Sequence, residues 1–577
     1  IATRVLSVDA GTPNAAAAEA EGLFHAFVTS ADARGTRALT EAWLARGRRF
    51  YERGDGERAM AAFASAYSGA SSAELERSTL LAIASVFRAR WDVRALTPLV
   101  RLLRGDDDAA IDPPVDALRV DAAIDRRDFM AAADLLDRLG EAAPPHLRGI
   151  QPALRNLARA TDLGPLEGSV PLVVDLERDG RDELLVTPLN PTRASSPREL
   201  LLRDFDGGPP RAVASLAGYG AARPVTDSPF VFVQHLADPN QWSLLELSRA
   251  AAPRERWRGT FVGGGVYNTC ADDLDGDGVP EIYVTLTAYR RGLFRVDLAR
   301  DGSLAVEPAK IVDAQIERLN SDGQALRTDD LDGDGRRELI VGLGPWSGYD
   351  LRILRWAGAG YETVAHAEIG SVRAVATFAG ADGQRWVAAE TGPDANRTLF
   401  PTPPHTGSTP GVHLLRLEGD RLVRGATLPP LLTTLQAGDV DGDSLDDLIY
   451  VGGDAVEGAH RLFVMRQGAD GGFSPIGLGL AEVVTAVQAD DDPEVELLVQ
   501  ADDHAWLLGH GPTDTPIRPE VLTPPRPPPP GLTDPALVSR WERADRLVAL
   551  GLEGLAARAL LDLAELVGPD LRAQVHD

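Results

Sequence analysis

The stretch at residues 330–341 constrains the fold of this chain more than any other. It carries three carboxylates at alternate positions, a glycine, a fourth carboxylate and an apolar run, namely Asp330, Asp332, Asp334, Gly335, Glu338 and Leu339-Ile340-Val341. Hard divalent cations bind several oxygen ligands at about 2.3–2.6 Å, and a turn of this kind supplies them from a few residues. Without a counter-ion, carboxylates about 4 Å apart repel each other by roughly 4 kcal/mol per pair at an effective dielectric near 20. The stretch therefore predicts a calcium-binding turn that leads into a β-strand.

The same pattern recurs along the chain. Two further copies precede apolar runs, and they contain Asp273, Asp275, Asp277, Gly278 and Glu281, and Asp439, Asp441, Asp443 and Asp447. A fainter copy contains Asp175, Glu177, Asp179, Gly180 and Glu183. A degenerate copy lies in residues 490–499, where Asp490 is taken as the first position.

The spacing of the copies predicts a repeat architecture. The first aspartates stand at 175, 273, 330 and 439, with the degenerate copy near 490. A unit of about 50 residues accounts for these positions if two units, near 224 and 382, have kept the strands and turn but not the carboxylates. Seven units with strand and turn signals at this period predict a seven-bladed β-propeller.

These copies resemble the FG-GAP/VCBS repeats of integrin-α-like β-propellers, over roughly residues 163–522. The resemblance implies that positions 1, 3, 5 and 9 of each loop offer side-chain oxygens to Ca²⁺ and that position 7 offers its backbone carbonyl. The position 7 residues are Arg181, Val279, Arg336 and Leu445. Two departures weaken particular loops. Ser444 stands where the sharp turn favours glycine, at a cost on the order of 1 kcal/mol, and Glu177 replaces an aspartate with a longer side chain.

Residues 1–162 predict helices, because alanines and leucines recur there at helical spacing. In the window from Trp43 to Ala66, small residues and aromatics are placed as in two antiparallel helices that meet at Gly54-Asp55. This window resembles a tetratricopeptide repeat, and weaker copies follow it. The resemblance implies an α-solenoid whose groove binds a protein or peptide partner.

Residues 523–532 are rich in proline and predict a stiff spacer. Residues 533–577 predict a second tetratricopeptide-like helix pair, and a lone pair cannot bury its apolar face. A closed propeller brings its entry and exit together, so we expect this pair to pack back on the N-terminal helices. The fold class is thus a multidomain α and β chain with a helical solenoid, a propeller and a C-terminal helix pair.

Composition excludes several function classes. The net charge of −28 and the absence of a basic stripe argue against nucleic-acid binding. No stretch is apolar for long enough to span a membrane. Cys270, the sole cysteine, is expected to be a buried strand residue, and Lys310, the only lysine, together with abundant alanine indicates a GC-rich bacterial genome. No nucleophile elbow, phosphate loop or histidine-based metal motif is present.

The expected function is a non-enzymatic, calcium-binding interaction or sensing module. We expect it to be the ligand- or protein-binding part of a larger bacterial signalling protein, for example a receptor Ser/Thr kinase; the start at Ile1 rather than at methionine is consistent with this expectation but does not establish it. Calcium loops favour a location outside the cytoplasm. Two alternatives stay open: a carbohydrate-binding propeller and a calcium-assisted enzyme that acts on polysaccharides.

Overall fold

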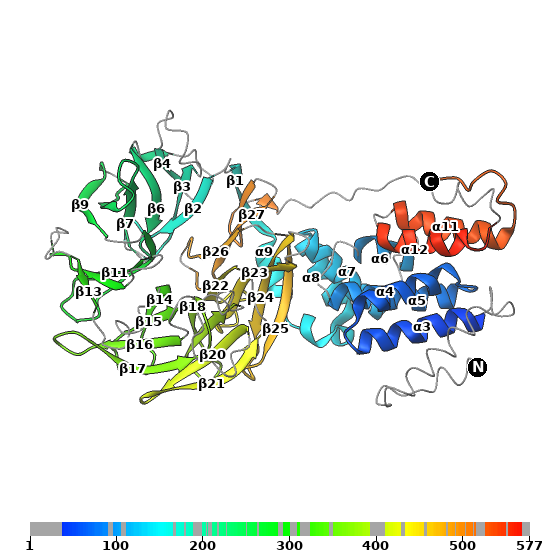
Figure 1. Ribbon diagram of the computed structural model, residues 1–577, viewed down its shortest axis with the longest axis horizontal. Helices are drawn as coiled ribbons and strands as arrows, with labels where there is room; N and C mark the ends of the chain where they lie inside the picture. The colour runs from blue at the N-terminus through cyan, green and yellow to red at the C-terminus, as the bar shows by residue number, and fades with distance from the viewer. Residues whose placement is uncertain are drawn as a thin grey trace. The chain divides into compact units, whose positions relative to one another are not determined.

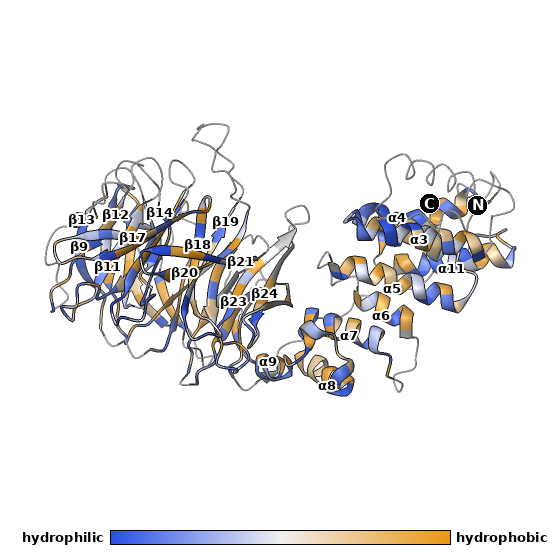
Figure 2. Cartoon of the chain, turned by 90° about the horizontal axis from the view of Figure 1, so that it is seen from below, coloured by the Kyte–Doolittle hydropathy of each residue, from blue (hydrophilic) through white to orange (hydrophobic). Residues whose placement is uncertain are grey.

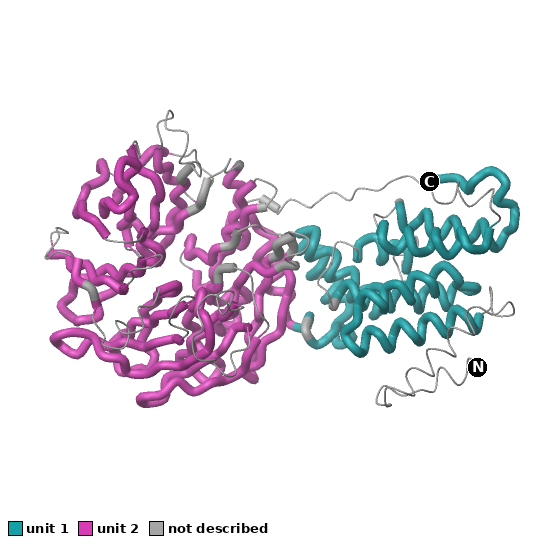
Figure 3. The backbone as a smooth tube through the Cα atoms, viewed as in Figure 1, with its two compact units in different colours: residues 1–148, 516–577 teal, residues 149–515 magenta. Residues whose placement is uncertain are grey.

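The computed structural model describes two compact units, which Figure 3 colours separately: residues 1–148 with 516–577, and residues 149–515. Within these units the described residues are 37–89, 96–104, 111–165, 169–177, 180–188, 199–203, 205, 211–215, 218–226, 228–249, 251–261, 265–286, 292–300, 308–311, 323–344, 350–392, 410–428, 433–454, 459–480, 483–490, 492–501, 504–511, 513–514, 526–549 and 552–567.

The first unit consists of helices that pack as antiparallel pairs. They are α3 (Arg37–Glu52), α4 (Gly56–Ser68), α5 (Ala73–Ala89), α6 (Leu96–Arg104), α7 (Pro113–Asp125) and α8 (Phe129–Leu139), followed by the short η3 (Gly140–Ala142) and η4 (Pro145–Leu147). The turn at Gly54-Asp55 joins α3 to α4 as predicted, and the Asp55 side chain caps α4 by accepting the Arg58 N–H. Gly47 allows the close approach of the two helices, since a Cβ there would lie 2.3 Å from the Phe63 ring. Helices of this unit carry both hydrophobic and hydrophilic residues, drawn in orange and blue in Figure 2.

The C-terminal pair, α11 (Pro535–Ala549) and α12 (Glu553–Ala564), belongs to the same unit. Ala544, Leu547, Leu555 and Ala559 of this pair are buried in one hydrophobic cluster with residues of α3 to α7. Arg543 donates a hydrogen bond to the Ser68 carbonyl at the end of α4. The helical unit is therefore assembled from two segments that are far apart in the sequence.

The described part of the proline-rich segment is packed rather than free. The Arg526 guanidinium donates to the buried Asp545 carboxylate at 2.8 Å and lies over the Trp541 ring, 5.4 Å from its centroid. This part of the predicted spacer is thus attached to α11.

The second unit begins with α9 (Gln151–Leu157) and contains seven β-sheets arranged in a ring (Figure 1). The first three four-stranded sheets are β2 (Ser169–Val174), β3 (Glu183–Pro188), β4 (Glu199–Arg203) and β5 (Arg211–Ser215); β6 (Tyr219–Pro224), β7 (Phe230–His235), β8 (Gln241–Glu246) and β9 (Arg254–Thr260); and β10 (Val266–Asp272), β11 (Glu281–Leu286), β12 (Leu293–Val296) and β13 (Ala309–Lys310). The next three are β14 (Gly323–Asp329), β15 (Glu338–Leu343), β16 (Asp350–Trp356) and β17 (Tyr361–Glu368); β18 (Val372–Ala379), β19 (Arg385–Thr391), β20 (Gly411–Glu418) and β21 (Arg421–Leu428); and β22 (Thr433–Gly438), β23 (Asp447–Asp454), β24 (Ala459–Gln467) and β25 (Phe473–Leu480).

The seventh sheet closes the ring by combining both ends of the unit. It contains β26 (Val483–Val487), β27 (Glu496–Ala501), β28 (His504–Leu508), β1 (Arg159–Pro165) and β29 (Thr513–Asp514), with β1 between β28 and β29. The first strands of successive sheets lie next to one another, so they line the inner side of the ring. Leu163, Leu184, Val487 and Leu507 share one buried cluster, which joins the seventh sheet to the first.

The prediction of a seven-bladed propeller is confirmed. All five acidic segments and both predicted carboxylate-free turns, near 224 and 382, join the first two strands of a sheet. The compact unit starts at Gly149 rather than at 163, because β1 is already a strand of the closing sheet and α9 precedes it. Cys270 is buried in β10, as expected. None of the helices in the described part of the chain combines the length and apolar character that a membrane crossing requires.

The helical unit carries a buried acid whose ionisation opposes folding. Burial raises the pKa of Asp121 on α7 to about 6, and the Arg88 guanidinium, 3.1 Å away, opposes that rise only in part. The unfolded carboxyl has a pKa of about 3.9, so the folded protein binds more protons between these values, and stability is lost as pH rises through that window. We expect Asp121→Asn to be neutral near pH 4 and to raise the free energy of unfolding by on the order of 1–3 kcal/mol at pH 7.

Urea unfolding of the helices, followed by circular dichroism at both pH values, checks this expectation. Glu52→Gln, which changes an exposed glutamate at the end of α3, is the matched control and should have little effect at either pH. An equal gain for Asp121→Asn at both pH values would contradict the assignment.

Candidate metal centres

The acidic segments form loops with a common backbone register. In each loop the N–H of position 2 donates to the carboxylate of position 9: Leu176 to Glu183 (2.7 Å), Leu274 to Glu281 (3.1 Å), Leu331 to Glu338 (3.0 Å) and Val440 to Asp447 (3.3 Å). The N–H of position 6 donates to the position 1 carboxylate: Gly180 to Asp175 (3.0 Å), Gly278 to Asp273 (2.8 Å), Gly335 to Asp330 (2.9 Å) and Ser444 to Asp439 (2.8 Å). These bonds hold the acidic side chains of positions 1 and 9 on the inner side of each turn.

Three loops bring predicted ligands close enough to share one ion. The groups whose carboxylate oxygens all lie within 4.8 Å of one another are Asp273, Asp275, Asp277 and Glu281; Asp330, Asp332 and Glu338; and Asp439, Asp441 and Asp447. Convergent oxygen donors of this kind suit a hard divalent cation.

Other predicted ligands are not brought together. Asp334 and Asp443 lie outside these groups, and each accepts the N–H of position 7, from Arg336 at 2.8 Å and from Leu445 at 3.0 Å. The Val279 N–H likewise donates to Asp277 at 2.7 Å. In the first loop Asp175, Glu177 and Glu183 form no such group, Arg181 is exposed, and Asp179 lies outside the described residues.

Burial disfavours the ionised form of the position 9 carboxylates and so raises their pKa values. It raises the pKa of Glu281 to about 7, although hydrogen bonds from Tyr283 and Leu274 and the charge of Arg295 oppose the rise. It raises the pKa of Asp447 to about 8, assisted by the negative charges of Asp441 and Asp443. Burial also raises the pKa values of Glu183 and Glu338. A bound cation would stabilise the ionised forms.

An arginine lies against each of the four predicted loops. Arg295 pairs with Asp275 and Glu281, Arg355 with Asp332 and Glu338, Arg466 with Asp441 and Asp443, and Arg249 with Glu177 and Glu183. Three of these arginines come from the third strand of the same sheet, whereas Arg249 follows β8 in the next sheet. The sequence analysis missed these partners, because nothing in the loop pattern marks them.

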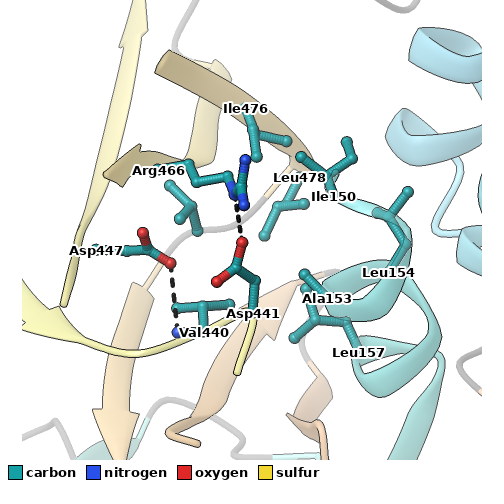
Figure 4. A pocket seen from close by; sticks show the side chains of 11 residues that line it. Ile150, Ala153, Leu154, Leu157, Val440, Asp441, Asp447, Arg466, Ile476 and Leu478 are labelled. Carbon is teal, nitrogen blue, oxygen red and sulfur yellow. Dashed lines mark hydrogen bonds and ion pairs between the residues drawn. The ribbon is translucent and has the colours of Figure 1, made fainter. Parts of the chain in front are cut away.

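The loop of the sixth sheet has an unsatisfied carboxylate oxygen. The Asp441 side chain is 3% exposed and pairs with Arg466 through Oδ2, while its Oδ1 is buried without a hydrogen-bond partner. Figure 4 shows this carboxylate beside a small cavity, which is lined on one side by Ile150, Ala153, Leu154 and Leu157. A buried, unsatisfied anion costs free energy, so this loop favours a cation.

The seventh loop follows the same register, but with different residues from those expected. Ala489 donates its N–H to Glu496 at 2.7 Å, Asp492 to Asp490 at 2.9 Å and Glu494 to Asp492 at 3.2 Å. Position 1 is therefore Gln488 and not Asp490, which corrects the sequence-based register by two residues. Asp490 takes position 3, and its carboxylate meets His510 Nδ1 at 3.0 Å. Asp490, Glu496 and His510 form a further convergent group. His510 had no signal in the sequence, because it is brought to the loop by sheet pairing.

Position 8 of several loops bonds to the preceding sheet. The Asp182 N–H donates to Gln488 O at 2.8 Å, Arg337 pairs with Asp272 at 2.6 Å, Asp446 accepts the Ala379 N–H at 2.7 Å, and the Val495 N–H donates to Asp439 O at 2.9 Å. The loops thus lie on one face of the ring, and each of these four loops is bonded to the preceding sheet.

No protein-family model matches the chain, and no curated protein matches it. Among solved structures, the chain is similar to one described as "Structure of Dos1 propeller", with a TM-score of 0.39 and 8% sequence identity, over 63% of this chain and 98% of that chain. The seven sheets of the ring are established by the strand pairing itself.

The sixth loop predicts a stabilising substitution. Ser444 has a φ of 66°, whereas glycine holds this position at 84° in the loops of Gly278 and Gly335. Ser444→Gly should relieve the strain and raise the free energy of unfolding of the propeller by about 0.5–1 kcal/mol. Ser444→Ala keeps the strain and should give no gain. Calorimetry of both variants checks the prediction, and equal stability of the two would contradict it.

Proposed function

We propose that this chain is a calcium-binding, non-enzymatic interaction module built on an FG-GAP/VCBS-type propeller. The observation that carries the proposal is the convergence of carboxylates in the loops at 273, 330 and 439, where the position 9 carboxylate of each loop is buried. Their donors are all oxygens, which suits Ca²⁺ better than a transition metal. The unsatisfied Asp441 Oδ1 and the raised pKa values of Glu281 and Asp447 support the same conclusion.

In this proposal Ca²⁺ supplies positive charge at the centre of each loop. The protein contributes the rest: the N–H groups of positions 2 and 6 hold the acidic side chains in place, and Arg295, Arg355 and Arg466 orient the position 3 carboxylates from outside. Tyr283 donates to Glu281 at 2.8 Å and meets the Tyr361 hydroxyl of the next sheet at 2.6 Å. Calcium in the loop at 273 would therefore also strengthen a contact between the third and fourth sheets.

The helical unit is proposed as tetratricopeptide-like and as a binding surface for a protein or peptide partner. Support comes from its successive antiparallel helix pairs and from the close crossing of α3 and α4 at Gly47 and Phe63. We further propose that the chain is the binding part of a larger bacterial signalling protein and that it works outside the cytoplasm, where millimolar calcium can fill sites of modest affinity.

A non-enzymatic role is proposed because the acidic clusters have the spacing and orientation of cation ligands rather than of an acid–base pair. Incubation of the calcium-loaded chain with a panel of polysaccharides, with reducing ends measured, tests this directly. Turnover would favour the enzyme alternative, and binding on a glycan array without turnover would favour a carbohydrate-binding propeller.

Calcium should stabilise the propeller through the loops at 273 and 330. At 10 to 100 times the dissociation constant, a ligand that binds only the folded state adds about 1.4–2.7 kcal/mol per site. We expect millimolar calcium to raise the melting temperature of the propeller, chelator to lower it, and the double variant Asp273→Asn/Asp330→Asn to lose most of the response. Differential scanning calorimetry is the measurement, because it records each unfolding transition of the chain.

The control for this experiment is Asp420→Asn, which changes an exposed aspartate in the turn between β20 and β21. This variant should respond to calcium as the parent does. An unchanged melting temperature with calcium and with chelator would refute the calcium proposal.

A further inference from the structure

We propose that the seventh loop is a separate site for a borderline transition-metal ion, best matched by Zn²⁺, with Asp490, Glu496 and His510 as its protein ligands. One ligand atom from each of these residues lies within 4.8 Å of the other two. Zinc binds imidazole nitrogen and carboxylate oxygen at about 2.0–2.2 Å, so small side-chain shifts would bring all three to one ion, with water as a fourth ligand.

Two substitutions make this loop unsuitable for calcium. Position 1 is Gln488, whose amide Nε2 donates to the backbone carbonyls of Asp490 and Asp492 where the other loops present an aspartate. Position 6 is Pro493, which has no N–H to orient a position 1 carboxylate. A hard cation would therefore meet an amide donor at the position where it needs an oxygen.

The basic partner of position 3 also differs in kind. In the four predicted loops it is an arginine, which has no lone pair to give and keeps its charge at every accessible pH. In the seventh loop it is His510, and a neutral imidazole is the commonest protein ligand for zinc and related ions. Among the loops that the structure describes, only this one combines two carboxylates with an imidazole that can also coordinate a metal.

Glu496 provides an independent indication that a cation belongs here. It is 1% exposed, and one of its oxygens accepts the Ala489 N–H. The corresponding residues Glu183, Glu281 and Glu338 each have an arginine partner, whereas within the described ranges no ion pair is formed by Glu496 or by Asp447 of the sixth loop. The buried Glu496 carboxylate faces two other potential ligands, and no cationic side chain in the described part of the chain pairs with it to balance its charge. A bound metal ion would explain that arrangement.

The position of the site gives it a structural consequence. His510 follows β28, and its carbonyl accepts a hydrogen bond from Thr161 on β1. The adjacent Gly509 exchanges hydrogen bonds with Arg159 of the same strand. An ion held by Asp490, Glu496 and His510 would thus tie the β26–β27 loop to the strand pair that closes the ring.

The experiment titrates the full chain with zinc chloride by calorimetry in millimolar calcium, which keeps the acidic loops saturated. We expect one equivalent of zinc to bind, and cobalt(II) to give the intense visible absorption of a four-coordinate site. His510→Ala and Glu496→Gln should weaken zinc binding by more than about tenfold. The matched control is His504→Ala, because His504 lies in the same sheet and also pairs with a single aspartate, Asp162, at 3.1 Å.

The control should bind zinc as the parent does. His510→Gln retains the side-chain volume and replaces His510→Ala if circular dichroism shows that the alanine variant is misfolded. Absence of a zinc equivalent in the parent chain overturns the proposal without any variant. Undiminished binding by the His510 variants, or an octahedral cobalt spectrum, also overturns it. Because the His510 and Glu496 variants alter only the seventh loop, a failure of the calcium loops would leave this result readable.

Discussion

The pairing of β1 with β28 is the interaction on which the propeller depends. Six sheets are each made from consecutive strands, and only the seventh combines a strand from before the ring with strands from its end. Without that pairing β28 would become an unpaired edge of the seventh sheet, and the apolar cluster that Leu163 shares with Leu184 and Leu507 would be exposed. Closure also constrains the four loops whose position 8 residue is bonded to the preceding sheet.

The sequence predicted the repeating part of the molecule well, because that part is encoded locally. A carboxylate pattern followed by an apolar run specifies a turn and a strand within a dozen residues. The period of these units also indicated the two units near 224 and 382, which lack the carboxylates. The register error in the seventh loop has the same origin: Asp490 and Asp492 imitate positions 1 and 3, and only the hydrogen bond from Ala489 to Glu496 shows that Gln488 comes first. The positions of His510 and Arg249 and the contact between the Tyr283 and Tyr361 hydroxyls depend on neighbouring strands or sheets, so spacing along the sequence could not reveal them.

Charge balance gives the loops their individual characters. The chain carries a net charge of −28, yet its loops are not simple anionic pockets, because an arginine already compensates part of each cluster. The negative charge that the arginines do not compensate differs from loop to loop. Asp441 has a carboxylate oxygen without a partner, Glu281 and Asp447 have raised pKa values, and Glu496 is a buried acid that faces an imidazole. One backbone template can thus be specialised by substitutions at positions 1, 3 and 6.

The two segments that build the helical unit have a mechanical consequence. The propeller is inserted between residues 148 and 516, so the chain leaves the helical unit and later returns to it. A pulling force that enters through α3 and leaves through α12 would be borne by the packing of α12 and α11 on α4, including the bond from Arg543 to Ser68. The ring of sheets would lie outside this load path and would keep its shape while the helices resist the tension.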